Sequence, residues 1–147
     1  MKAQDLMTTE PACCAPSSTV REAAQLMREH DCGCIPVVEG KSKRLVGMVT
    51  DRDVACRCVA EGKSPDTPVR EIMTTNPQSS HPEDDIAAVE QIMIEAKVRR
   101  VPVVDDGGRC IGMIAQADLA LNHEAATDRD VGHVVERISE PGSSKTT

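Results

Sequence analysis

The 147-residue chain contains no phenylalanine, tyrosine or tryptophan. Proteins that bind single-stranded nucleic acid stack the bases on aromatic side chains, so this absence argues against such a partner. Basic residues are also in the minority, because 17 Lys and Arg stand against 24 Asp and Glu, which gives a formal net charge of −7 at pH 7. Nucleic-acid phosphates are bound by clustered positive charge. We therefore expect no nucleic-acid partner.

The sequence also lacks any apolar run close to the roughly 18 residues that a membrane-spanning helix requires. Residues 1–5 do not form the apolar segment of a secretory signal peptide. We therefore expect a cytoplasmic protein with no membrane partner. The length and the 39% apolar content are sufficient for one compact domain or for two small fused halves.

The chain has seven cysteines, an odd number that does not suit a framework of disulfide bonds. None of the close pairs has the C-x2-C spacing of a zinc knuckle, and cysteine is a common small core residue. Buried, reduced thiols are the default interpretation. A metal-sensing or redox-sensing function stays open as an alternative, and it would use Cys13, Cys14, Cys32 and Cys34.

An internal repeat with an offset of 66 positions organises the sequence. Residues 5–11 (DLMTTEP) return as residues 71–77 (EIMTTNP), and residues 35–38 (IPVV) return as residues 101–104 (VPVV). After a one-residue deletion, the Gly-Met-Val of the first half matches the Gly-Met-Ile of the second. Matches at one offset across both halves indicate a tandem duplication.

The first half predicts a helix, two strands and a second helix. Thr19 and Glu22 have the spacing of a capping box at the start of an amphipathic helix. The apolar runs at residues 34–38 and 45–49 are typical of buried strands. The second helix is expected to begin at Thr50.

The second half predicts the same elements. Its first helix is expected to have Pro82 at the first helical position, because proline is favoured there. Strands follow at residues 101–104 and 109–114, and a last helix starts near Gln116.

The repeats define the expected domain organisation. We predict a first repeat at residues 1–61, a linker at 62–68, a second repeat at 69–126, and a C-terminal helix with a frayed tail at 127–147. A repeat of 50 to 60 residues is close to the lower size limit for an independent core. The apolar stripes of the two repeats are therefore expected to bury one another about a pseudo-twofold axis, with paired clefts between the halves.

This order of elements, with the IPVV strand and residues 47–53 (GMVTDRD), resembles the CBS (cystathionine β-synthase) domain, and two copies resemble a Bateman module. The likeness covers about residues 2–122 and is to small stand-alone bacterial CBS-pair proteins. It implies an α/β fold of two βαββα-type repeats. It also implies a homodimeric regulatory module, not an enzyme, with no tightly bound cofactor. Such a module senses AMP, ADP, ATP, NAD or S-adenosylmethionine and signals to a separate target protein.

Thr50 and Asp53 are the residues best suited to contact such a ligand. They lie three residues apart in the first turn of a predicted helix, so their side chains share one side of it. A carboxylate can accept hydrogen bonds from both hydroxyls of a ribose, and the resemblance implies this role for the pair. The same spacing is also that of a plain helix cap. A purely structural dimerisation module, in which the pair only caps a helix, is therefore a further alternative.

The second copy retains a ribose-binding carboxylate at Asp118 but has Ala115 in place of the threonine. The loss of one hydrogen-bond partner costs roughly 0.5–1.5 kcal/mol, which is about tenfold in affinity. The second site is therefore expected to be weaker, differently selective or empty.

Further contacts follow from the resemblance alone. It implies that Arg99 and Arg100 reach a ligand phosphate, and the alternative is a solvated pair that balances the acidic turn after the strand. The resemblance also implies a set of adenine-side residues, for which plain core packing is the competing interpretation. This set comprises Ala12, Cys13, Cys14, Ile35 and Pro36 in the first repeat, and Gln78, Ser79, Val101 and Pro102 in the second.

Overall fold

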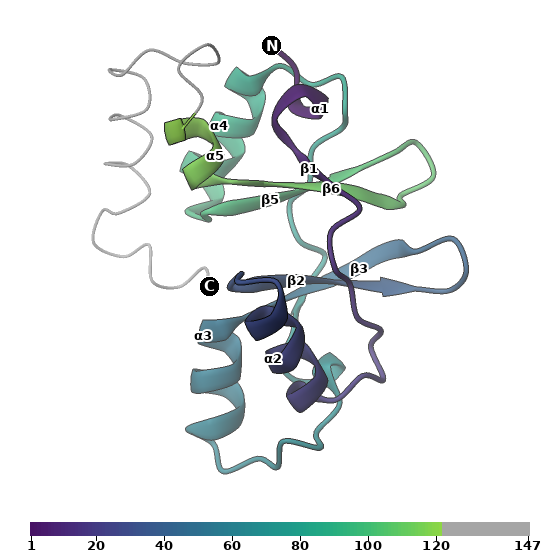
Figure 1. The fold of residues 1–147 in the computed structure, drawn as a ribbon, viewed down its shortest axis with the longest axis vertical. Helices are drawn as coiled ribbons and strands as arrows, with labels where there is room; N and C mark the ends of the chain where they lie inside the picture. The colour runs from purple at the N-terminus through teal and green to yellow at the C-terminus, as the bar shows by residue number, and fades with distance from the viewer. Residues whose placement is uncertain (122–147) are drawn as a thin grey trace. The chain divides into compact units, whose positions relative to one another are not determined.

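The computed structural model describes residues 1–121, so the helix and tail expected at residues 127–147 lie outside the described residues. The described part is mixed α/β, as predicted (Figure 1). Its elements are α1 (Ala3–Leu6), β1 (Thr8–Thr9), α2 (Val20–Glu29), β2 (Cys34–Glu39), β3 (Arg44–Thr50), α3 (Asp51–Asp53), a π-helix (Val54–Val59), a 3-10 helix (Val69–Glu71), β4 (Thr74–Thr75), α4 (Ile86–Ala96), β5 (Arg100–Val104), β6 (Cys110–Ala115) and α5 (Gln116–Leu121). None of the described helices has the length and apolar character needed to cross a membrane.

The chain forms two compact units whose boundaries differ from those of the sequence repeats. The α2 unit consists of residues 11–77 and 107–110. The α4 unit consists of residues 1–10 and 78–106 together with the chain from residue 111, of which residues 111–121 are described. The N-terminal segment therefore packs with the second repeat, while the start of the second repeat packs with the first.

Each unit contains a three-stranded sheet to which both repeats contribute. In the α2 unit the strand order is β2-β3-β4, and β3 is antiparallel to both neighbours. In the α4 unit the order is β1-β6-β5, with β1 antiparallel to β6. Gly47 pairs with Thr75 in one sheet, and Gly112 pairs with Thr9 in the other. The two repeats thus exchange equivalent two-residue strands, which the sequence analysis did not predict.

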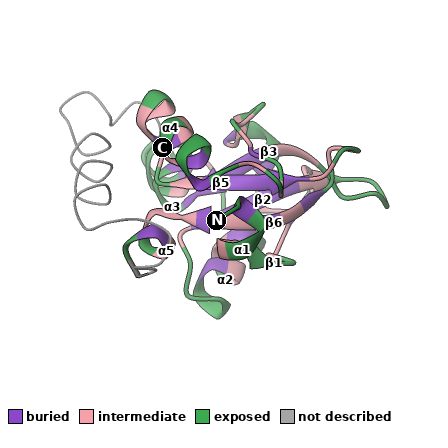
Figure 2. Ribbon diagram, turned by 90° about the horizontal axis from the view of Figure 1, so that it is seen from above, coloured by how far each residue is buried: buried purple, intermediate pink, exposed green. Residues whose placement is uncertain are grey.

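Each unit buries its own apolar core, and the strands β2 and β5 are largely buried (Figure 2). The stripe of α2 packs on its own unit's strands through Val20, Ala23 and Met27. The stripe of α4 does the same in the α4 unit through Ile86, Val89 and Met93. Each stripe is therefore covered inside its own unit, and the packing of the repeats about a pseudo-twofold axis stays a prediction.

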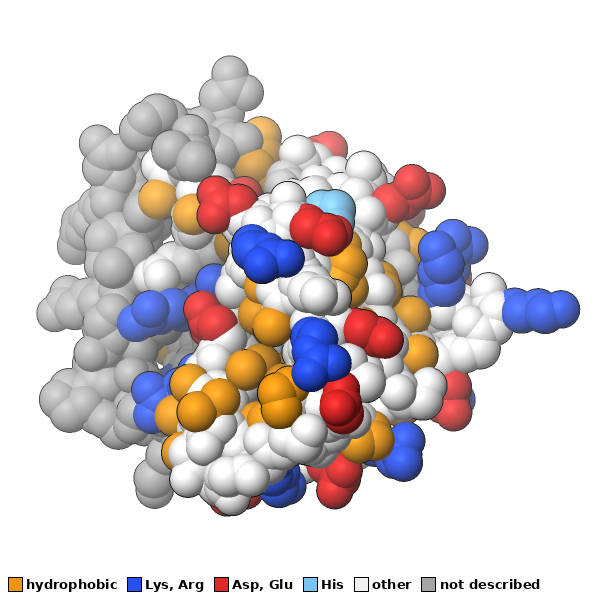
Figure 3. All heavy atoms as spheres, turned by 60° about the horizontal axis from the view of Figure 1, so that its bottom comes forward, with side chains coloured by type: hydrophobic (Ala, Val, Ile, Leu, Met, Phe, Trp, Pro, Cys, Tyr) orange, Lys and Arg blue, Asp and Glu red, His pale blue; other side chains and the backbone are white. Residues whose placement is uncertain are grey.

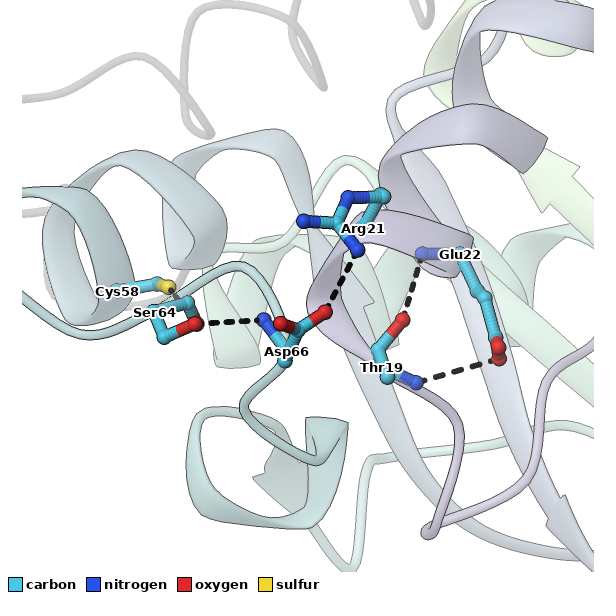
Figure 4. Close-up of polar contacts among 6 residues, drawn as sticks. All are labelled: Thr19, Arg21, Glu22, Cys58, Ser64 and Asp66. Carbon is cyan, nitrogen blue, oxygen red and sulfur yellow. Dashed lines mark hydrogen bonds and ion pairs between the residues drawn. The ribbon is translucent and has the colours of Figure 1, made fainter.

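The start of α2 confirms the predicted capping box (Figure 4). Thr19 Oγ1 accepts a hydrogen bond from the backbone N–H of Glu22 at 3.1 Å, and Glu22 Oε2 accepts one from the N–H of Thr19 at 3.3 Å. Next to it, the Arg21 guanidinium forms an exposed ion pair with Asp66 at 2.6 Å. Exposed pairs contribute at most about 1 kcal/mol, so the cap and the apolar stripe account for more of the position of α2 than this pair does.

The expected start of the first helix of the second repeat at Pro82 was wrong, because α4 begins at Ile86 with Asp85 as its N-cap residue. The preceding residues form a turn in which Asp84 accepts a hydrogen bond from the backbone N–H of His81 at 2.8 Å. Asp85 is extended and forms a β-bridge with Lys2. Asp85 occupies the repeat position of Thr19, so the duplication itself marks this helix start better than the proline does.

A residue with positive φ follows each exchanged strand, Glu10 at 46° and Asn76 at 47°. Asparagine tolerates this left-handed region well, whereas the longer glutamate side chain does not. We expect Glu10→Asn to raise the free energy of unfolding by about 1 kcal/mol, measured by urea denaturation. The reciprocal change Asn76→Glu is expected to lower it by a similar amount. Equal effects of the two changes in the same direction would contradict this assignment.

Candidate functional site

Thr50 and Asp53 lie at the junction where β3 passes into α3, inside the α2 unit. Thr50 Oγ1 accepts a hydrogen bond from the backbone N–H of Asp53 at 3.1 Å. Asp53 Oδ2 accepts one from the backbone N–H of Thr50 at 2.9 Å. Both residues are buried, with 6% of Thr50 and 0% of Asp53 exposed. These reciprocal bonds form a capping box, so the helix-cap role of the pair is confirmed.

The other carboxylate oxygen of Asp53 faces Arg57. Asp53 Oδ1 lies 3.8 Å from Arg57 Nε, and Arg57 Nη1 donates a hydrogen bond to the carbonyl of Ile72 at 3.3 Å. A buried carboxylate is stable only when it is paired and hydrogen-bonded, and Arg57 supplies the opposite charge. Arg57 lies in the π-helix. π-helices are rare in proteins overall, and those that occur are often found at functional sites. The sequence analysis predicted a helix here but identified neither Arg57 nor this winding.

The second copy of the motif has half of this arrangement. Asp118 Oδ2 accepts a hydrogen bond from the backbone N–H of Ala115 at 2.7 Å. Ala115 has no side-chain oxygen to return a bond to the N–H of Asp118. Asp118 is also only half-buried, whereas Asp53 is fully buried. The two carboxylates therefore accept equivalent backbone hydrogen bonds, from Thr50 and from Ala115, but lie in different surroundings.

The expected adenine-side segments lie beside the strands that the sequence analysis named. The backbone N–H of Cys14 donates to the carbonyl of Pro36 at 3.0 Å, and Cys14 forms a parallel bridge with Val37. In the α4 unit the N–H of Ser80 donates to the carbonyl of Pro102 at 2.9 Å. The structure therefore brings residues 12–14 beside β2 and residues 78–80 beside β5.

The side chains of this set differ in burial. Ile35 and Val101 are fully buried in the cores of their units, in agreement with the packing interpretation. Contact of either side chain with a ligand stays a prediction. Among the others, Cys14, Pro36 and Pro102 are buried, Ala12, Cys13 and Ser79 are half-buried, and Gln78 is exposed.

Ser80 is a candidate that the sequence analysis missed. It is fully buried, and its Oγ has no hydrogen-bond partner among the described residues. A buried hydroxyl without a partner costs about 1–3 kcal/mol, so Ser80 is a place where a polar group of a ligand would be favourable. Its repeat counterpart, Cys14, has no hydroxyl, and comparison of positions 14 and 80 was the signal available in the sequence.

Arg99 and Arg100 lie at the start of β5, in the α4 unit with Asp118. Arg99 is exposed and Arg100 is half-buried. The carbonyl of Arg99 accepts a hydrogen bond from the backbone N–H of Gln116 at 2.8 Å, which holds the start of α5 next to this strand. On the surface shown in Figure 3, basic and acidic side chains are interspersed, not segregated by sign. A phosphate-binding role of the two arginines stays a prediction.

The four cysteines of the metal-sensing alternative do not come together as a metal centre. Among residues 1–121, no three His, Cys, Asp or Glu side chains are grouped so that they could hold a metal ion. Cys32 is exposed and its Sγ donates to the carbonyl of Cys34 at 3.7 Å, while Cys34 itself is buried. Burial raises the pKa of the Cys14 thiol to about 12, which disfavours the thiolate that metals bind.

Comparison with known proteins identifies the family. The model of the CBS domain matches residues 3–58 and again residues 69–122. The chain belongs to the CBS domain family. The CBS domain-containing protein YhcV of Bacillus subtilis is 40% identical over 136 residues, which cover 92% of this chain and 94% of YhcV.

Solved CBS structures resemble the fold closely. Hypoxic Response Protein I, crystallised with two coordinated zinc ions, has 35% identity and a TM-score of 0.75, covering 82% of this chain and 97% of that chain. The CBS domain pair of protein MJ0100, in complex with 5′-methylthioadenosine and S-adenosyl-L-methionine, has 27% identity and a TM-score of 0.74. That match covers 82% of this chain and 93% of the MJ0100 chain. The chain is therefore a tandem CBS pair.

Proposed function

We propose that this CBS pair is a regulatory module that binds an adenosine-containing ligand through Thr50 and Asp53. The observation that carries the proposal is the buried pair of a hydroxyl and a carboxylate held together at the end of β3. The MJ0100 CBS pair was solved with two ligands that share an adenosine group. The ribose of adenosine has two neighbouring hydroxyls, for which a carboxylate is a suitable acceptor.

Ligand binding at Asp53 requires a local change, because the side chain has no exposed surface. Oδ2 is engaged by the N–H of Thr50, but a carboxylate oxygen can accept more than one hydrogen bond. Oδ1 faces Arg57, whose side chain is 47% exposed and can move into solvent. In our proposal the ribose hydroxyls replace the Arg57 contact while the helix cap stays in place.

Ligand binding at this site acts by changing the conformation of the protein. Occupancy shifts the population of conformations, and a separate target protein responds to that shift. The protein acts in the cytoplasm as a homodimer and catalyses no reaction. In this proposal the site at Asp118 is weaker because Ala115 offers no hydroxyl, and Arg99 and Arg100, which belong to the same unit, contact a ligand phosphate.

Thermal unfolding with AMP, ADP, ATP, NAD and S-adenosylmethionine tests the proposal, using the wild type and Asp53→Asn. Asparagine still accepts the hydrogen bond from the N–H of Thr50, so the cap persists, but it has neither the charge nor the second acceptor oxygen. At a hundredfold excess over its dissociation constant, a ligand should add about 2.7 kcal/mol of apparent stability to the wild type. Asp53→Asn should bind at least about tenfold more weakly.

Asp118→Asn is the matched control, and it should retain the larger part of the wild-type response. Circular dichroism is a suitable readout, because the chain has no tryptophan or tyrosine to report unfolding by fluorescence. If none of the five compounds stabilises the wild type, or if Asp53→Asn responds as strongly, Thr50 and Asp53 serve only as a helix cap and the ribose proposal is wrong.

A further inference from the structure

Arg57 connects the proposed ligand site to the segment that leads into the exchanged strand β4. Its Nε lies 3.8 Å from Asp53 Oδ1, and its Nη1 donates a hydrogen bond to the carbonyl of Ile72 at 3.3 Å. Asp53 is in the turn that follows β3, and Ile72 lies shortly before β4. All of these residues belong to the α2 unit. One guanidinium group therefore contacts both the ligand site and the approach to β4.

The segment that Arg57 contacts is short. Its 3-10 helix covers Val69–Glu71, Ile72 is the C-cap residue, and the backbone N–H of Met73 donates to the carbonyl of Val69 at 2.9 Å. The strand β4 that follows has two residues and pairs with β3. A segment opens locally most easily where few contacts hold it. The bond from Arg57 to the Ile72 carbonyl is therefore expected to matter for the local stability of this segment.

The two contacts of Arg57 depend on each other. The guanidinium group is a rigid planar fork, so the contact of Nε with Asp53 also fixes the direction of Nη1 toward Ile72. Holding a long side chain in one geometry costs conformational entropy, which the two contacts offset together. The Arg57 side chain is 47% exposed, so water can replace either contact. Loss of the Asp53 contact is therefore expected to weaken the bond to Ile72 as well.

We propose that Arg57 couples ligand binding at Asp53 to the exchanged strand. A ligand hydroxyl at Asp53 displaces the guanidinium, and the displaced Arg57 no longer holds residues 72–75. This inference rests on the proposed function, because it requires the ribose to replace the Arg57 contact. It identifies β4, which the second repeat contributes to the sheet of the α2 unit, as the part that responds to the ligand. Coupling is reciprocal, so the Arg57 contact in turn lowers the affinity for the ligand.

Hydrogen–deuterium exchange of the full-length chain without ligand tests the contact with Ile72. In Arg57→Ala, the amides of residues 73–75 should exchange about fivefold faster than in the wild type, as expected for the loss of one hydrogen bond. Arg57→Lys keeps the charge but has no planar fork, so its exchange should also be faster. Arg52→Ala is the matched control, because Arg52 is an exposed arginine of α3, and it should exchange like the wild type. Unchanged exchange in either Arg57 variant would overturn the proposal.

The same measurement with each of the five compounds tests the coupling. A compound that stabilises the wild type against heat should also make residues 73–75 of the wild type exchange about fivefold faster, whereas β2 should show no such increase. Arg57→Ala should bind that compound about fivefold more tightly, because the competing contact is gone, and its residues 73–75 should show no further increase.

The outcomes separate this inference from the proposed function. If a compound stabilises the wild type while residues 73–75 keep their exchange rate, the coupling is wrong and the ribose proposal stands. Weaker binding by Arg57→Ala would show that Arg57 contacts the ligand itself, which also overturns the coupling. If none of the five compounds binds, the ribose proposal and the coupling are both wrong, whatever the exchange of the unliganded variants.

Discussion

Asp53→Ala is expected to lower the free energy of unfolding by about 3 kcal/mol, measured by urea denaturation. The change removes the acceptor for the buried N–H of Thr50 and leaves that donor without its side-chain partner. It also removes the charge that faces Arg57 and opens a small space in a fully buried position. Loss of a cap alone costs about 1 kcal/mol, and the unpaired buried N–H adds to it.

Asp118→Ala is the matched comparison for this prediction. Asp118 also accepts a backbone hydrogen bond, from Ala115, but it is half-buried, so water can replace the lost acceptor. Its loss should cost about 1 kcal/mol. If the two alanine variants are equally stable, the burial of Asp53 does not have the importance that we assign to it.

Gly47→Ala should destabilise the α2 unit by about 2–3 kcal/mol. A Cβ atom at Gly47 would lie 2.6 Å from the Met73 sulfur and 2.9 Å from the carbonyl oxygen of Thr74. The methionine side chain can move, but the Thr74 carbonyl is backbone in β4, the strand that pairs with β3 at this point. The substitution therefore separates the exchanged strand from its sheet. Urea denaturation of the variant gives the size of the effect.

Gly112→Ala tests how much of this loss of stability comes from contact with a methionine side chain and how much from contact with the backbone of β4. At Gly112 the three nearest atoms to an added Cβ all belong to Met7: its Sδ and Cγ can rotate away, but its Cβ, at 3.0 Å, is fixed to the backbone. This variant should therefore lose less stability than Gly47→Ala only by the contribution of the β4 carbonyl, although the two glycines are equivalent in the repeat. A larger loss at Gly112 would show that the methionine, not the backbone of β4, limits the space.

The sequence predicted the elements that carry strong local signals. The Thr19–Glu22 capping box is present at the start of α2, and the apolar runs became β2, β3, β5 and β6. The strands β1 and β4 were not predicted, because a two-residue strand is too short to show an alternating pattern. The start of α4 was misplaced because the expectation rested only on the preference of proline for the first helical position. It did not take into account the turn before the helix, in which the Asp84 side chain accepts a hydrogen bond from the backbone N–H of His81.

The part of the candidate site that depends on local contacts could be predicted from the sequence. The spacing of Thr50 and Asp53 predicts reciprocal hydrogen bonds within one helical turn, and the structure contains both. The Arg57 contact depends on the π winding after Asp53, and the unpartnered hydroxyl of Ser80 depends on how β5 packs beside it.

The exchange of β1 and β4 has a consequence for how such a chain can arise. An ancestral polypeptide with a single copy of the motif would have one short strand that its own sheet does not use and one sheet edge without a partner strand. Two identical molecules can complete each other's sheets by swapping that strand. Fusion of two gene copies makes the swap intramolecular, so that completion of the sheets no longer depends on protein concentration.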